Sequence, residues 1–258
     1  MGKKQQVIEE IFRICLKNND FTFTNEIVKV VCKKYNFKNP FDVTKLDNTS
    51  VFPQILIDND YFILHLGKGK HRFVKGIHNG YHDFEEIEEE NIINWKYMKS
   101  ILNELDTSES NILSIVSNQR IIHDFLYDDI VANPKVYNAR RTKTDLFYKA
   151  GEYQINALKQ QMEIDLTFEY MGKVTIFEGK NGFPKDFAIY QLFHPFKYYF
   201  KIQKESKLDI NQITCCYVLR KQQKRDSIIK LYNYTFKDTN DISSIKLLKK
   251  AQYNLIKR

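Results

Sequence analysis

The chain has 258 residues, 43% of them hydrophobic and 14% aromatic, with only 9 glycines and 5 prolines. This composition predicts one large or two smaller globular domains and argues against long disordered stretches. The chain contains no run of eighteen apolar residues and no secretory apolar segment near its first residues, so we expect a cytoplasmic protein without membrane spans.

Charge is distributed unevenly along the chain, although the net charge is +8. Residues 1–82 carry 13 basic and 8 acidic residues, 83–130 carry 3 and 12, and 131–258 carry 24 and 12. This pattern favours two modules that face a polyanion, separated by an acidic spacer. The four cysteines lack a CxxC spacing, so we expect buried free thiols and no zinc site.

Residues 1–82 predict three helices followed by a β-hairpin. Apolar residues recur at helical spacing over 4–17 and 25–35, and Pro53 suits the first turn of a short helix over about 50–58. Two alternating segments, 61–66 and 71–77, then flank a tip of glycines and lysines. This order is that of a winged-helix module, whose wing would contact DNA phosphates. The basic residues of the wing are Lys68, Lys70, His71, Arg72 and Lys75. The alternative is a hairpin that only packs on its neighbour.

Residues 83–130 predict a helical linker or the first helices of a second domain. The segment 84–105 is acidic at first and then apolar with helical periodicity, and a further helix is expected from Thr107 to about Leu126. We interpret the acidic run as a solvated helix start and His123 as a packing residue.

A basic stretch precedes the most distinctive part of the chain. Arg140, Arg141 and Lys143 lie among aromatic residues and favour phosphate contacts, with a solvated loop as the alternative. Glu152 follows and is a candidate additional acid.

Residues 163–181 predict two strands joined by a tight turn at Gly172. Strand alternation places the following charged residues on one edge of a sheet: Glu163, Asp165, Glu178 and Lys180. Carboxylates this close repel each other unless a cation neutralises them, and Mg²⁺ binds through one or two carboxylates while keeping several waters. A neighbouring lysine can orient water or stabilise a phosphate. A solvated hairpin face is the alternative interpretation.

The remaining residues predict a helix over about 186–203, strands over 213–219 and 228–236, and a closing helix over about 241–256. The apolar run around Cys215 and Cys216 is typical of a strand that is buried on both faces. The predicted fold is therefore α/β, or α+β for the whole chain, with a three-layer core around a mixed central sheet.

The spacing Asp165…Glu178-Gly179-Lys180 resembles the signature of PD-(D/E)xK nucleases. The resemblance implies that Asp165 and Glu178 hold Mg²⁺ and that Lys180 assists the attacking water. It also suggests a cleft glutamine at Gln191, although Pro195 stands where the fuller QxxxY pattern has tyrosine, and it leaves His194 as a cleft or packing residue.

A winged-helix-like domain (1–82), a linker or start of the second domain (83–130) and a PD-(D/E)xK domain (131–258) together resemble certain Type II restriction endonucleases. This implies Mg²⁺-dependent cleavage of double-stranded DNA at a specific sequence, with a cognate DNA methyltransferase as genetic partner. A structure-specific repair or junction nuclease and an inactive DNA-binding regulator are the alternatives. The recognition site and the choice between monomer and homodimer stay open, and we expect the first 82 residues to supply DNA affinity without chemistry.

Overall fold

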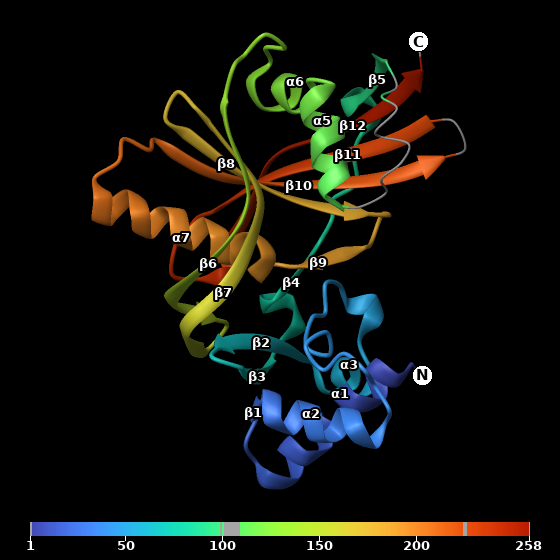
Figure 1. Cartoon of the computed structure of the whole chain (residues 1–258), viewed down its shortest axis with the longest axis vertical. Coiled ribbons are helices and arrows are strands. Elements are labelled where there is room, and N and C mark those ends of the chain that lie inside the picture. Colours follow the sequence, from blue (N-terminus) through green and yellow to red (C-terminus); the bar gives the residue numbers. More distant parts are fainter. Residues whose placement is uncertain (1, 99, 101–108, 224–225, 258) are drawn as a thin grey trace.

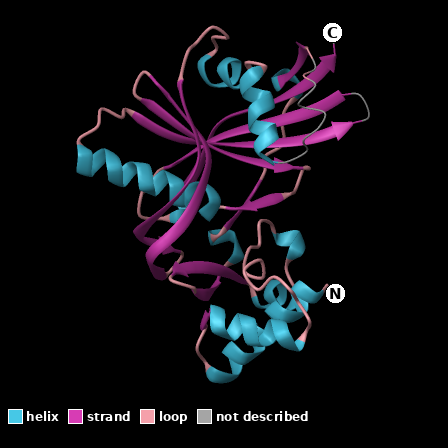
Figure 2. Ribbon diagram, in the orientation of Figure 1, coloured by secondary structure: helices cyan, strands magenta, loops and turns pink. Residues whose placement is uncertain are grey.

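The computed structural model describes the chain except residues 1, 99, 101–108, 224–225 and 258. A helical N-terminal region lies below a large mixed sheet with helices on both faces (Figure 1). Figure 2 shows the same division by secondary structure. The expected α+β class with a mixed central sheet is confirmed. In the described part of the chain, no helix is long and apolar enough to cross a membrane.

The N-terminal region consists of three helices and a small sheet in the order β1-β3-β2. Its helices are α1 (Lys3–Asn18), α2 (Asn25–Lys34) and α3 (Gln54–Asn59). Its strands are β1 (Thr22–Thr24), β2 (Tyr61–Gly67) and β3 (Lys70–Lys75). The expected helices and hairpin are thus present. The third helix begins later than predicted, because Thr49–Val51 forms a separate 3₁₀ turn and Pro53 is the extended N-cap of α3.

Seven strands form the large sheet in the order β5-β12-β11-β10-β8-β7-β6. On one side of the sheet are β5 (Ile92–Tyr97), β12 (Ile245–Lys257), β11 (Asp226–Phe236) and β10 (Gln212–Gln223). On the other are β8 (Lys173–Asn181), β7 (Tyr153–Tyr170) and β6 (Lys135–Ala150). The pairs β8–β10 and β5–β12 are parallel and the other pairs are antiparallel, which makes the sheet mixed.

Helices cover both faces of this sheet. α7 (Tyr190–Ser206) packs on one face with Cys215 and Tyr217 of β10. α5 (Glu109–Asn118) and α6 (Ile121–Tyr127) pack on the other, with Cys216. Alternate residues of β10 therefore enter different cores, which confirms the three layers and the strand buried on both faces. All four cysteines are buried free thiols, as expected.

Two predicted helices are strands. Over 84–105 the described residues contain the 3₁₀ turn Glu89–Asn91 and then β5, which pairs in parallel with β12. Residues 99 and 101–105 of that predicted helix, like the helix start at Thr107, lie outside the described residues. Over 241–256 the chain forms the 3₁₀ turn Ile242–Ser244 and then β12. A bulge at Asn233/Tyr234 in the pairing with β11 leaves Leu248 without a partner in the register, and this interrupts the alternation along β12.

Two helix boundaries also differ from the prediction. Residues 186–188 are β9 (Asp186–Ala188), which pairs with β4 (Tyr81–Asp83), so α7 begins only at Tyr190. The helix expected up to Leu126 is divided into α5 and α6 by Arg120, whose φ is 62°. A further 3₁₀ turn, Ile77–Asn79, follows the N-terminal hairpin.

The hairpin of β6 and β7 extends from the sheet down to the N-terminal region, where β2 lies against β7 (Figure 1). Gly67, at the tip of the N-terminal hairpin, has a φ of +74°, and any Cβ there would overlap the backbone carbonyl of Leu158 on β7. The tip of the N-terminal hairpin therefore packs closely against β7 of the large sheet.

Candidate active site

The charged residues of the predicted hairpin lie where β7 and β8 separate. The two strands pair from Tyr170↔Lys173 to Leu166↔Phe177, and the pairing ends there. Continuing the same register places Asp165 of β7 opposite Glu178 of β8, at the point of separation. Because side chains alternate along a strand, Lys180 lies on the same face as Glu178. Asp165, Glu178 and Lys180 all line one cavity.

This cavity, of about 930 Å³, lies between the N-terminal region and the large sheet. Its acidic lining residues are Asp47, Glu163, Asp165 and Glu178. Its basic lining residues are Lys45, Lys68, Lys70, Arg141, Lys143, Lys159 and Lys180. Seven cations against four carboxylates make the lining net positive, which favours a polyanion as ligand.

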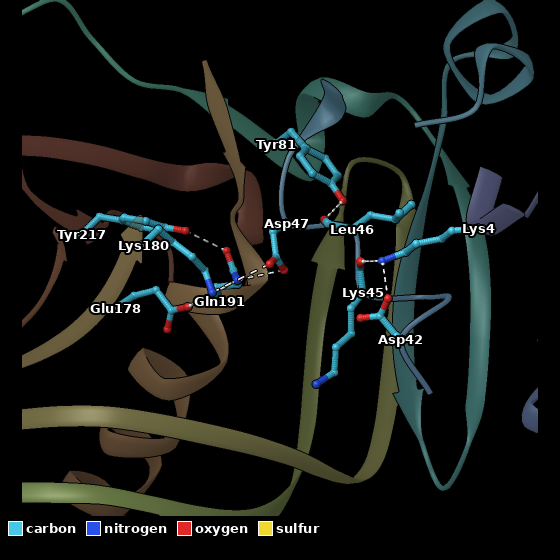
Figure 3. A network of polar contacts seen from close by, with 10 residues as sticks. All are labelled: Lys4, Asp42, Lys45, Leu46, Asp47, Tyr81, Glu178, Lys180, Gln191 and Tyr217. Atoms are coloured by element: carbon cyan, nitrogen blue, oxygen red, sulfur yellow. Dashed lines mark hydrogen bonds and ion pairs between the residues drawn. The ribbon is translucent and has the colours of Figure 1, made fainter. Parts of the chain in front are cut away.

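A compact polar network joins two of these acids to one lysine (Figure 3). Lys180 Nζ lies 3.3 Å from Glu178 Oε1 and 3.8 Å from Asp47 Oδ2. Gln191 Nε2 donates to both carboxylates, at 3.2 Å to Asp47 Oδ1 and 3.4 Å to Glu178 Oε1. The Tyr217 hydroxyl donates to Gln191 Oε1 at 3.1 Å, which orients the amide. Gln191, weakly indicated by the sequence, is thus in direct contact with the predicted site.

The donor chemistry of the cavity suits Mg²⁺, which prefers carboxylate oxygen. In the described ranges, no group of three or more His, Cys, Asp or Glu side chains is arranged to hold a metal ion. Mg²⁺ does not require such a cage, because it is commonly bound by one or two carboxylates and several waters. Asp165 and Glu178 supply two such carboxylates to one cavity, and the ammonium group of Lys180 already places a positive charge beside Glu178.

Two buried neutral groups form the adjoining wall. Burial, with the negative charges of Asp47 and Glu178, raises the pKa of Tyr190, which therefore remains a neutral phenol. Burial lowers the pKa of His194 to about 3, and its Nε2 lies 2.9 Å from the Tyr148 hydroxyl. His194 lines the cavity as a neutral, hydrogen-bonded residue and is a poor candidate for a proton donor near neutral pH.

The predicted basic contacts divide into two groups. Lys68, Lys70, Arg141 and Lys143 line the cavity, whereas Arg72, Lys75 and Arg140 do not. Arg140 lies on the opposite face of β6 from Arg141 and stacks over Tyr198 and Tyr199 of α7, 5.1 and 5.4 Å from the ring centroids. Arg72 stacks on Tyr153 at 5.4 Å. The stretch interpreted as one phosphate-binding cluster is therefore a strand that presents its basic residues on two faces.

The two additional acids also differ. Glu163 lines the cavity and pairs with Arg141, with Oε1 2.6 Å from Arg141 Nε. Glu152 is exposed in the turn between β6 and β7 and does not line the cavity.

The sequence does not single out Asp47 as a site residue. Its neighbour Asn48 caps the 3₁₀ turn Thr49–Val51. No local pattern indicates that Asp47 reaches Lys180, because the contact depends on how the N-terminal region packs against β9 and α7.

Comparison with known proteins gives two family matches and no relative with an assigned role. No curated protein and no solved structure matches the chain. Residues 5–73 match the family described as Domain of unknown function (DUF6996). Residues 76–254, more than half of the chain, match the family described as Domain of unknown function (DUF6997). The chain therefore belongs to the DUF6997 family, and its residues 5–73 are similar to DUF6996.

Proposed function

We propose that the protein is a Mg²⁺-dependent endonuclease that hydrolyses phosphodiester bonds in double-stranded DNA. The observation that carries the proposal is the meeting of Asp165, Glu178 and Lys180 at the separation of β7 and β8, in a cavity with a net positive lining. The PD-(D/E)xK resemblance and this geometry support the same chemistry. Membership of the DUF6997 family neither adds to nor opposes it.

Each side chain has a defined role in this chemistry. Asp165 and Glu178 would hold Mg²⁺, which when bound supplies positive charge to the phosphate and acidifies its water. Lys180, whose side chain is 17% exposed, would orient the attacking water and stabilise the negative charge that develops on the phosphoryl oxygens. Attack by water in line with the leaving group forms a new P–O bond and breaks the bond to the 3′ oxygen. The attacking water loses one proton and the 3′ oxygen takes up one from solvent, which leaves a 5′-phosphate and a 3′-hydroxyl. Gln191 would keep the Glu178 carboxylate in position.

The basic residues around the cavity would bind the DNA backbone. Lys68 and Lys70 come from the N-terminal hairpin, and Arg141, Lys143 and Lys159 come from β6 and β7, so phosphates on two sides of the scissile bond would meet cations. In this proposal the winged-helix-like residues 1–82 contribute sequence recognition. The described elements of residues 83–130 pack with the second domain, because β5 joins its sheet and α5 and α6 cover one face of that sheet.

Among such nucleases, we favour a Type II restriction enzyme of the cytoplasm, with a DNA methyltransferase as genetic partner. The decisive experiment is digestion of a sequenced plasmid with the purified protein and Mg²⁺, followed by mapping of the ends. Discrete fragments with a shared terminal sequence are expected. Cleavage only at junctions or flaps would instead identify a structure-specific nuclease, and metal-dependent DNA binding without any nicking would identify an inactive regulator.

A further inference from the structure

Asp47 occupies the same polar network as the proposed catalytic residues, although it comes from the N-terminal region. Among the described residues 2–82, it is the one acidic side chain that lines the cavity. Its Oδ2 lies 3.8 Å from Lys180 Nζ and its Oδ1 accepts from Gln191 Nε2 at 3.2 Å. Glu178 contacts the same two nitrogen atoms. Asp47 and Glu178 therefore hold equivalent positions around one lysine and one amide.

The backbone on both sides of Asp47 is fixed to the paired strands β4 and β9. The carbonyl of Asp47 accepts from Ala188 N at 2.9 Å, and the carbonyl of Leu46 accepts from the Tyr81 hydroxyl at 2.6 Å. The carboxylate of Asp186 accepts from Thr49 N at 2.7 Å and from the Thr49 hydroxyl. Asp186 is only 4% exposed. Burying a carboxylate is costly unless it is fully hydrogen-bonded, so this contact fixes the loop firmly.

A purely structural role for the Asp47 side chain is the competing explanation. The loop is already attached through backbone groups and through Asp186, so attachment does not require the Asp47 carboxylate. That side chain is still 45% exposed, and the two partners that fix it are Lys180 and Gln191. A carboxylate directed at the site residues and open to the cavity is available to a cation or to a water in the site.

We propose that Asp47 is a carboxylate of the active site, supplied across the domain contact, and that Asp186 is the positioning residue that holds its loop. This rests on the proposed nuclease function. Asp47 would add a negative charge to the site on the far side of Lys180 and Gln191, the two residues that it shares with Glu178. The N-terminal region would then contribute to the chemistry as well as to DNA binding.

The test compares Asp47→Asn with Asp42→Asn in the full chain. Asp42 is a matched control, because it lies on the same loop, its side chain is also 45% exposed, and it pairs with Lys4 away from the site. Three quantities are measured: the rate of DNA cleavage, the Mg²⁺ concentration that gives half of the maximal rate, and the rise in melting temperature caused by Mg²⁺ alone. Asp47→Asn should lower cleavage by about 100-fold, raise the half-maximal Mg²⁺ concentration about tenfold or more, and reduce the Mg²⁺-induced rise. Asp42→Asn should behave as wild type.

Asp186 is tested separately as a positioning residue. Asp186→Ala should raise the half-maximal Mg²⁺ concentration by about tenfold, with a smaller effect on the maximal rate at saturating Mg²⁺. Asp186→Asn keeps one acceptor oxygen for Thr49, so its half-maximal Mg²⁺ concentration should lie close to that of the wild type. A loss of stability that left the half-maximal Mg²⁺ concentration unchanged would overturn the positioning role.

The outcomes separate this inference from the proposed function. If the wild type cleaves DNA and Asp47→Asn stays within about threefold of Asp42→Asn in rate and in Mg²⁺ response, the inference is overturned and the nuclease stands. If the wild type does not cleave any DNA, the nuclease proposal falls. The melting temperature with Mg²⁺ alone then still decides whether Asp47 belongs to a cation site, and an equal rise in the wild type and Asp47→Asn overturns that role too.

Discussion

Replacing Lys180 by methionine removes one positive charge from the centre of the site while keeping an unbranched side chain of similar length. The ammonium group lies 3.3 Å from Glu178 and 3.8 Å from Asp47. The side chains of Lys180 and Glu178 are 17% and 14% exposed, so water screens this pair poorly. The Asp47 side chain is 45% exposed and its pairing with Lys180 is screened more strongly.

The expected loss of stability follows from these distances. At 4 Å and an effective dielectric of 20, one ion pair has a gross attraction of about 4 kcal/mol, most of which the cost of desolvation offsets. The more exposed pair with Asp47 contributes at most about 1 kcal/mol. We therefore expect Lys180→Met to lower the free energy of unfolding by about 1–3 kcal/mol in EDTA. Mg²⁺ should restore more stability to the variant than to the wild type, because the ion replaces the missing charge.

Cleavage should become slower in Lys180→Met, although Mg²⁺ should stabilise this variant more than the wild type. The rate should fall by about 100-fold or more in Lys180→Met at saturating Mg²⁺, because water and phosphate lose their charged partner. Urea unfolding in EDTA and in Mg²⁺, with cleavage rates, provides the assay. Lys250→Met is the control. Lys250 lies on β12, its side chain is also 17% exposed, and its Nζ lies 2.8 Å from Glu88 Oε1. A rate within about tenfold of wild type, equal to about 1.4 kcal/mol, would refute the catalytic role. If Mg²⁺ stabilised Lys180→Met and Lys250→Met equally, this would refute the idea that Mg²⁺ and Lys180 use the same carboxylates.

Three other predictions concern the site, the N-terminal hairpin and a buried histidine. Asp165→Asn should abolish cleavage but leave DNA binding and folding intact, and near-normal cutting would remove Asp165 from the site. Charge reversal of Lys68 and Lys70 should weaken DNA binding and make the dependence of log affinity on log salt concentration shallower. Charge reversal of Lys75, which lies outside the cavity, should have less effect. Equal salt slopes for the two variants would argue against DNA contact by the hairpin tip. Burial lowers the pKa of His71 from 6.5 to about 4, so the folded state binds this proton less readily than the unfolded state. The free energy of unfolding should therefore fall as pH drops from about 6.5 to 4, by up to about 1.4 kcal/mol per pH unit, and His71→Gln should reduce that slope in urea titrations.

The part of the site that sequence predicts is the part built from local contacts. The hairpin of β7 and β8 follows from the alternation around Asp165 and from the turn at Gly172, whose φ is +77°, and both features involve residues close in the chain. The burial of β10 on both faces follows from its continuous apolar run. The α1 helix and the N-terminal hairpin are predicted for the same reason, because their periodicity is uninterrupted.

The errors arise where long-range pairing decides the structure. β12 carries Ala251, Tyr253 and Leu255 at strand spacing, but its bulge shifts the apolar positions near Leu248, and the remaining pattern also fits a helix. β5 is a strand because β12 lies beside it, and β12 is far away in sequence. Local propensity does not contain this information.

The position of Asp47 argues against treating residues 1–82 as a separable DNA-binding module. The segment 186–191 both holds the Asp47 loop, through Asp186 and Ala188, and begins the helix that carries Gln191. Any shift of the N-terminal region against β9 must therefore move Asp47 relative to Gln191 and Lys180. The expectation that this region supplies affinity without chemistry fails if Asp47 acts as we propose. A fragment that begins near residue 83 would lack one carboxylate of the network and the Thr49 partner of the buried Asp186. DNA contacts made by the N-terminal hairpin would then influence cleavage through the geometry of the site as well as through binding.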